Sequence, residues 1–186
     1  TKGYLLNSSK PSRLPVLAMY HSVSEAPIRN WGPWQYSITS EDFAKQLSMI
    51  NKKYTVISVD EMFKWLAEGE PIARNCIILT FDDAYCDFKS EALPILEKYD
   101  FPATVYVPTR LLDNNKAPFE YRLATELHKR DELNVTVDGF TVNTSLRTQK
   151  EVVSTYSNIR TKFKSSSIKR RENLLEKIEM NSKPTN

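Results

Sequence analysis

The sequence predicts an α/β fold in which strands and helices alternate around a parallel sheet or barrel. Four short apolar or β-branched runs alternate with segments of helical periodicity along the first 112 residues. Parallel strands need a crossover connection, which is usually a helix, so this order is typical of a parallel sheet. At 186 residues, the chain is long enough for one domain with a sizeable core.

The four expected strands are each short, apolar and bounded by polar or turn residues. They cover residues 14–21, 55–58, 76–82 and 103–107. The run Ile77–Phe81 is almost entirely apolar or β-branched, which is typical of a strand buried on both faces. We therefore expect this third run to be the central strand.

The expected helices begin at recognisable caps. Thr39 precedes a helix that buries Phe43, Leu47 and Ile50, and Ser58 with Glu61 forms a capping box. The second helix is expected to turn Met62, Phe63 and Leu66 inward and to end at Gly69. A third helix covers residues 88–99, where Pro94 is acceptable near the first turn or at a kink.

The pattern changes beyond residue 112. A loop at 113–118 precedes a helix at 119–129, and residues 134–143 alternate around Asp138-Gly139, which is a hairpin signal. Two polar helices are expected at about 147–164 and 168–180. We expect domain boundaries of 1–13 for a lead-in, 14–112 for the strand-helix units and 113–186 for an insertion with hairpin and basic helices.

The pair Asp82-Asp83 follows the central strand directly, at the strand end where α/β folds place their functional sites. Neighbouring residues point in different directions, so one acid can bind a cation while the other accepts a proton. Two adjacent negative charges favour a divalent ion or a basic partner nearby. The structural alternative is a solvated turn that caps the next helix.

Composition narrows the functional classes. Residues 1–144 hold 16 basic and 19 acidic residues, whereas residues 145–186 hold 10 and 4, so the basic excess lies in the last segment. Its basic run Arg160–Arg171 has one aromatic residue, Phe163, and no reading motif, so we expect a solvated helical face and no nucleic-acid partner. No run reaches the roughly 18 apolar residues of a spanning helix. Cys76 and Cys86 are expected to be free thiols.

Four stretches together resemble the polysaccharide deacetylase family, the NodB-homology domains of carbohydrate esterase family 4. They are Val16–His21, Leu79–Tyr85, Ala92–Tyr99 and Phe101–Val107. The resemblance covers about residues 14–112, and the following segment resembles an insertion found in part of the family. It implies a partial deformed (β/α) barrel and removal of N-acetyl groups from sugar polymers.

The resemblance also implies roles for individual residues. Asp83 would ligate a divalent metal, usually zinc, and Asp82 would be the general base for the metal-bound water. His21, Tyr85 and Arg110 would line the substrate site. For His21 the alternative is a histidine satisfied by backbone, and for Tyr85 it is packing against the next helix. His128 is expected at the surface.

The sequence departs from the family in two ways. Its only histidines are His21 and His128, so the family's His-[Ser/Thr]-x-x-His ligand motif is absent from these residues. We therefore expect this chain to be the N-terminal part of a longer protein, nearly inactive alone and with an open sheet edge that favours self-association. Residues 84, 100 and 110 also replace usual glycines, so Ala84 is strained if its φ is positive.

Other interpretations stay open. A non-catalytic carbohydrate-binding relative would use the same aromatic loop, Trp31–Tyr36, to stack on sugars. A receiver domain also carries an acidic pair, but it needs a further phospho-accepting Asp and a Lys at later strand ends. An isoprenoid-binding DDxxD site fails because Asp87 is one position late. The compartment is extracytoplasmic or the cell envelope if the start is a trimmed terminus, and otherwise cytoplasmic.

Overall fold

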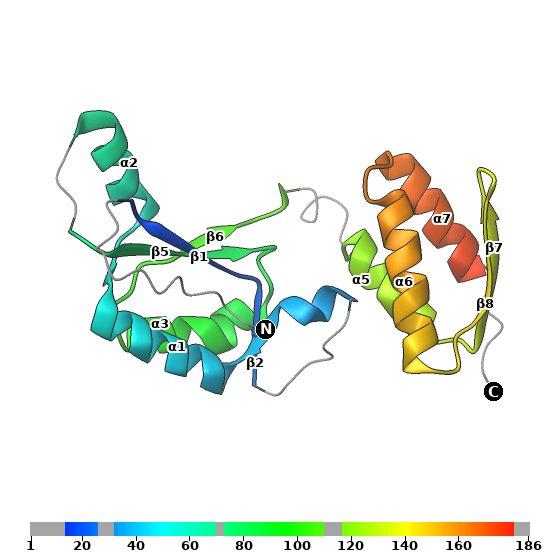
Figure 1. Ribbon diagram of the computed structural model, residues 1–186, viewed down its shortest axis with the longest axis horizontal. Coiled ribbons are helices and arrows are strands. Elements are labelled where there is room, and N and C mark those ends of the chain that lie inside the picture. The colour runs from blue at the N-terminus through cyan, green and yellow to red at the C-terminus, as the bar shows by residue number, and fades with distance from the viewer. Residues whose placement is uncertain (1–13, 26–31, 70–72, 110–116, 181–186) are drawn as a thin grey trace. The chain divides into compact units, whose positions relative to one another are not determined.

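The computed structural model describes residues 14–25, 32–69, 73–109 and 117–180 (Figure 1). The chain divides into two compact units. Unit 1 comprises residues 1–30 and 34–109, and unit 2 comprises residues 31–33 and 110–186. Within the described residues, no helix has both the length and the apolar character that a membrane crossing requires.

Unit 1 is built on a parallel sheet with β5 (Cys76–Asp82) at its centre. Strand β1 (Val16–Tyr20) pairs along one side of β5. Strands β4 (Thr55–Val56) and β6 (Thr104–Tyr106) pair along the other side, and all three pairings are parallel. The predicted α/β class and central strand are confirmed, whereas closure into a partial deformed barrel stays a prediction.

The main core lies between this sheet and two helices, as Figure 1 shows. Helix α1 (Ser40–Lys53) is capped by Thr39, whose hydroxyl accepts a hydrogen bond from the Asp42 amide. Its inward residues are those that the sequence predicts, and they meet the alternate residues of β5. The buried members are Phe43, Leu47 and Ile50 from α1, Ile77, Leu79 and Phe81 from β5, and Leu96 from α3.

Helix α2 (Val59–Glu68) begins at the expected capping box and ends at Gly69 with a φ of 72°. The prediction that Phe63 and Leu66 point inward is wrong, because they are 58% and 59% exposed. Val59 and Met62 pack against the sheet instead, beside Ile57, Cys76 and Ile78. Phe63 lies about 100° around the helix from Met62 and therefore points away from the sheet. Leu66, seven residues after Val59, lies on nearly the same side as Val59 but in the last turn of the helix, where it is exposed.

The helix after β5 begins as a π-helix, η2 (Phe88–Ala92), and continues as α3 (Leu93–Glu97). Pro94 explains the change, since it has no N–H and its ring would clash with the Ser90 carbonyl of a regular α-helix. The Leu93 N–H instead bonds the Phe88 carbonyl, five residues back. Pro94 therefore lies near the first turn of α3, as the sequence predicts.

A second, two-stranded parallel ribbon lies next to the sheet and was not predicted. Strand β2 (Ser22–Ser24) follows β1 after one residue, and β3 (Ser37–Thr39) follows the 3-10 helix η1 (Gly32–Tyr36). Ser22 pairs with Ser37 and Val23 with Ile38. Val23 is fully buried in the main core, so the ribbon is anchored to unit 1.

Unit 2 packs three helices with a hairpin. They are α5 (Phe119–His128), α6 (Gln149–Phe163) and α7 (Ile168–Met180), with β7 (Glu132–Val137) and β8 (Phe140–Ser145). The turn residues Asp138 and Gly139 have φ values of 49° and 77°, as a type I′ turn requires. These elements confirm the predicted helices and hairpin, and His128 is exposed as expected.

Tyr20 gives unit 1 a measurable pH dependence. Its ring packs on Phe43 and Phe81, and burial raises the pKa of its phenol to about 12. Because the folded pKa exceeds the unfolded value, this contribution to stability is complete below about pH 10 and is lost as the pH rises towards 12. We expect about 2 kcal/mol of the free energy of unfolding to disappear across this window.

The Tyr20→Phe variant should flatten that part of the pH profile in urea unfolding experiments. The Tyr106→Phe variant removes one exposed phenol and serves as the control. An equally steep alkaline loss of stability in Tyr20→Phe and in the unmodified chain would contradict the assignment.

Candidate active site at the strand ends

The carboxyl ends of β1, β5 and β6 meet at one edge of the sheet, because the three strands are parallel. Asp82, the last residue of β5, lies in the same row as Tyr106 of β6. Tyr20 is paired with Phe81, so His21 follows β1 one residue further, beside Asp82 on the other side. The structure thus places His21, Asp82 and Tyr106 at adjacent strand ends.

Asp82 and Tyr106 belong to the face of the sheet that α1 and α3 leave uncovered. Leu17 and Met19 pair with Ile78 and Thr80, which precede Asp82 by four and two residues on the same face. Leu17 and Met19 are 59% and 58% exposed, and Tyr106 is 51% exposed. Ile78 and Thr80 are themselves 1% exposed, so among the described residues the accessible parts of this face lie along β1 and at Tyr106, on either side of β5.

The His21 ring stacks on the Tyr36 ring, with centroids 5.0 Å apart and planes at 22°. This contact extends the β2–β3 pairing by one residue, since Ser22 pairs with Ser37. Tyr36 is itself 45% exposed. The His21–Tyr36 aromatic pair therefore lies directly after β1, the strand that pairs with β5, and Tyr36 has an exposed edge.

Asp83 leaves the strand in a left-handed turn. Its φ is 69°, and that of Ala84 is 48°. The Tyr85 hydroxyl donates a long hydrogen bond of 3.3 Å to Asp83 Oδ2. The turn separates the two acids, so Asp82 stays in the sheet row while Asp83 is held by the segment that follows.

The positive φ of Ala84 and the φ of 53° at Asp100 confirm that both replacements occupy positions suited to glycine. An alanine in this region costs about 1–2 kcal/mol, because its Cβ approaches the following carbonyl oxygen. Aspartate adopts the region more readily. The third replacement, Arg110, lies outside the described residues.

Asp87 is a second carboxylate close to the strand ends. The Ser22 hydroxyl donates to its Oδ2 at 2.6 Å, and the Val23 amide also donates to the carboxylate. Burial raises the pKa of Asp87, and the hydrogen bonds from Ser22 and Val23 oppose that shift. Its Oδ1 is buried without a hydrogen-bond partner among the described residues, which costs about 1–3 kcal/mol.

The described residues do not complete a metal site. Within the segments that the structure describes, no three His, Cys, Asp or Glu side chains converge as an ion requires. Oxygen donors of the right chemical class are present in Asp82 and Asp83, because Zn²⁺ accepts Asp oxygen as well as His nitrogen. These two acids supply part of a ligand set.

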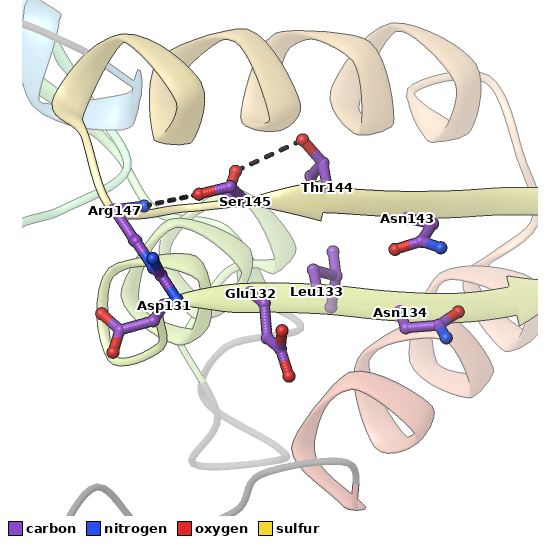
Figure 2. Close-up of a pocket in the computed structure, with 8 residues that line it drawn as sticks. All are labelled: Asp131, Glu132, Leu133, Asn134, Asn143, Thr144, Ser145 and Arg147. Atoms are coloured by element: carbon purple, nitrogen blue, oxygen red, sulfur yellow. Dashed lines mark hydrogen bonds between the residues drawn. The ribbon is translucent and has the colours of Figure 1, made fainter.

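A hollow of about 500 Å³ lies in unit 2, along the base of the β7–β8 hairpin (Figure 2). Its walls are polar and include Asp131, Glu132, Asn134, Asn143 and Arg147. It contains no histidine, and none of the residues that the sequence singles out lines it. The candidate active site is therefore at the strand ends of unit 1, where the residues predicted from the sequence lie.

Comparison with known sequences agrees with this geometry. Residues 69–167, which are 99 of 186, match the family model described as polysaccharide deacetylase. The chain belongs to the polysaccharide deacetylase family. The match begins before β5 and ends between α6 and α7, so it includes the acidic pair and much of unit 2.

Individual relatives of this polysaccharide deacetylase family member match shorter stretches. YxkH of Bacillus subtilis (strain 168), which carries the family's name, is 27% identical over 103 residues, covering 55% of this chain and 34% of YxkH. Poly-beta-1,6-N-acetyl-D-glucosamine N-deacetylase of Escherichia coli (strain K12) is 25% identical over 96 residues, covering 51% of this chain and 14% of that protein.

Among solved structures, the Streptococcus pyogenes deacetylase PplD in complex with acetate is 32% identical to this polysaccharide deacetylase family member. The TM-score is 0.46, with 58% of this chain and 48% of PplD covered. The chain thus spans at most about a third of the two curated relatives and about half of PplD.

The structure brings together some of the predicted residues and adds others. His21, Asp82, Asp83 and Tyr85 lie at or just after the strand ends. Tyr106 and Asp87 were missed, and Tyr36 was expected only as the end of the aromatic loop Trp31–Tyr36. Tyr106 could have been found by aligning the ends of the predicted strands, whereas the contacts of Tyr36 and Asp87 depend on the unpredicted ribbon.

Strain at residue 84 is testable with a pair of substitutions. We expect Ala84→Gly to raise the free energy of unfolding by about 0.5–1 kcal/mol, because glycine adopts a positive φ without a clash. Asp100→Gly should give a smaller gain, since aspartate already tolerates that region. Urea unfolding of both variants measures the difference, and a loss of stability in Ala84→Gly would refute the strain.

Proposed function

We propose that this chain carries the acidic half of the active site of a metal-dependent deacetylase that removes N-acetyl groups from sugar polymers. The observation that carries the proposal is the position of Asp82 and Asp83 at the end of β5, beside His21 and Tyr106 on the accessible face. Membership of the polysaccharide deacetylase family supports the same chemistry. The E. coli relative's name supports an N-acetylglucosamine polymer as substrate.

Asp82 is proposed as the general base. No hydrogen bond or ion pair holds its carboxylate within the described residues, so it can accept a proton from an attacking water. Its position in the strand fixes the direction of that carboxylate towards the accessible face. A base that is held rigidly beside the scissile amide raises the rate through orientation as well as through proton transfer.

Asp83 is proposed as a ligand of a divalent metal, with zinc as the expected ion. The described residues supply an incomplete set, so the remaining ligands would come from outside them. Such an ion supplies Lewis-acid chemistry, because it acidifies water and polarises a carbonyl. The Tyr85 hydroxyl already contacts Asp83 and would keep its carboxylate oriented.

The substrate would be held by side chains around the acids. His21, Tyr85 and Arg110 are the residues proposed from the sequence, and Arg110 suits an anionic sugar. Tyr106 adds an exposed ring in the row of Asp82. The apolar face of a pyranose ring packs well on such an aromatic surface, while its hydroxyls remain available for hydrogen bonds.

Three further features stay proposals. Unit 2 would be the insertion expected at 113–186, following a partial deformed barrel at 14–112. Exposure of Leu17 and Met19 supports a sheet face that further strands could close. Self-association through an open sheet edge is the other way to cover β1, whose one described partner in this sheet is β5.

Release of acetate from N-acetylglucosamine oligomers tests the function. We expect the whole gene product that contains these residues to release acetate with zinc or cobalt, and Asp82→Asn to lower kcat by about 100-fold or more. The exposed Asp60 of α2 provides the control, since Asp60→Asn removes one carboxylate remote from the strand ends. The 186-residue chain alone should show little or no turnover.

Oligomer binding without acetate release by the whole gene product would favour the non-catalytic carbohydrate-binding alternative. Equal activity in Asp82→Asn and in the unmodified protein would remove Asp82 from the mechanism. Turnover by the 186-residue chain comparable with that of an intact relative would overturn the expectation that it lacks essential ligands.

The sugar contact of Tyr106 has its own test. We expect Tyr106→Ala to weaken binding of N-acetylglucosamine oligomers by about 5- to 30-fold, because a stacked ring contributes about 1–2 kcal/mol. Tyr106→Trp should retain binding. Phe63→Ala removes a similarly exposed ring from α2 and should bind as the unmodified chain does. Calorimetric titration measures all three, and equal losses in Tyr106→Ala and Phe63→Ala would contradict a specific contact.

A further inference from the structure

We propose that Asp87 is a positioning residue: with Ser22 it fixes the backbone corner after β1 and thereby holds the His21 imidazole beside Asp82. The inference rests on the proposed function, because it assigns His21 a place in that site. Asp87 is not adjacent to the acidic pair in the sequence, and it is not one of the expected metal ligands.

The hydrogen bond between Ser22 and Asp87 joins two segments that are 65 residues apart in the chain. Ser22 follows His21 directly, and Asp87 precedes η2, four residues after Asp83. The Val23 amide donates to the same carboxylate. One side chain therefore ties the residues after His21 to the helix that follows the acidic pair.

His21 depends on its neighbours for its position. Before it, Tyr20 is held by the contacts of its ring with Phe43 and Phe81. Its hydroxyl also donates a hydrogen bond to Gln46 Oε1 at 3.0 Å. After it, Ser22 is 4% exposed and Val23 is fully buried. The chain changes direction between these anchors, so the angle of the corner decides where the imidazole lies.

Stability alone does not account for a carboxylate at position 87. Its Oδ1 is buried without a hydrogen-bond partner among the described residues, and burial raises its pKa. A raised pKa means that this group favours the folded state below the unfolded pKa and loses that contribution as the pH rises through the folded pKa. At neutral pH the charged Asp87 carboxylate therefore weakens the fold. A role in positioning the residues after His21 is consistent with a carboxylate at this site.

The same helix offers a similar serine–carboxylate bond that does not involve the two residues after His21. Ser40 donates to Glu91 Oε2 at 2.7 Å, one turn beyond Asp87. The chemistry and the length of the two bonds are alike, but Ser40 begins α1. Substitution of Ser40 thus controls for the general loss of a serine–carboxylate bond to η2.

Nuclear magnetic resonance of the imidazole groups tests the proposal directly. The chain has two histidines, and His128 lies on α5, so His128→Asn assigns the two signals. We expect Ser22→Ala and Asp87→Ala to shift or broaden the His21 signals and to leave those of His128 in place. Asp87→Asn should retain the His21 spectrum of the unmodified chain, because the amide oxygen of asparagine still accepts a hydrogen bond from Ser22. Ser40→Ala should leave His21 unchanged.

In the whole gene product, Ser22→Ala should lower kcat for acetate release by about 10- to 100-fold, as expected when a site group is misplaced by about 1 Å. Ser40→Ala should keep kcat within about twofold of the unmodified value, which is the usual scale of surface effects. Asp87→Asn should retain most of the activity, whereas a catalytic role for the charge of Asp87 predicts a loss as large as in Asp87→Ala.

Unchanged His21 signals in Ser22→Ala would overturn the proposal, and this variant decides the matter even if Asp87→Ala fails to fold. Equal changes in Ser22→Ala and Ser40→Ala would overturn it too, since both would then report general loosening. The spectra do not need turnover. Absence of deacetylase activity would therefore count against the proposed function, while the position of His21 would still be measured.

Discussion

Burial of β5 on both faces is the constraint on which unit 1 depends. Every residue from Cys76 to Phe81 is at most 2% exposed, so the backbone groups of the strand must be paired within the protein. Parallel pairing with β1 on one side and with β4 and β6 on the other supplies those bonds. A charged side chain without a partner is too costly inside such a buried strand. The first position of β5 at which a charged side chain occurs is its carboxyl end. The location of Asp82 follows from the packing of the strand that precedes it.

The segment after β5 contains several features that lower the stability of the fold and fix the direction of the chain. Asp83 and Ala84 both have positive φ values, and the buried Oδ1 of Asp87 has no partner within the described residues. Pro94 then imposes a π-helix on the next turns. Each of these features is less stable than a regular strand-to-helix connection would be, and all lie within twelve residues of Asp82. Their concentration at one strand end agrees with a site whose side chains must be held in fixed directions.

The sequence predicted those parts of the molecule that local signals determine. The caps at Thr39 and Ser58, the left-handed end at Gly69 and the Asp138-Gly139 turn each need a few neighbouring residues, and each was confirmed. Phe63 was misplaced because the contacts of Val59 and Met62 with the sheet fix the rotation of the helix, and Leu66 was misplaced because it lies in the last turn, after those contacts. Tyr106 and Asp87 acquire their importance from strand register and from a hydrogen bond to Ser22. Such contacts join residues far apart in the chain, and periodicity within one segment carries no information about them.

The ion pairs of unit 2 contrast with the Asp82 carboxylate, which is unpaired among the described residues, and this contrast supports the choice of site. In unit 2, Arg122 binds Glu172 and Glu179, Arg130 binds Glu126, and Arg170 binds Asp138. Arg171 lies over the Phe119 ring. Charges of this kind are neutralised within the fold and contribute to its specificity. In unit 1, by contrast, Asp82 has neither an ion pair nor a hydrogen bond to its carboxylate in the described segments, although it stands at the most constrained strand of the protein. An acid that is rigidly placed, accessible and without a structural partner is available for chemistry, whereas the paired charges of unit 2 are not.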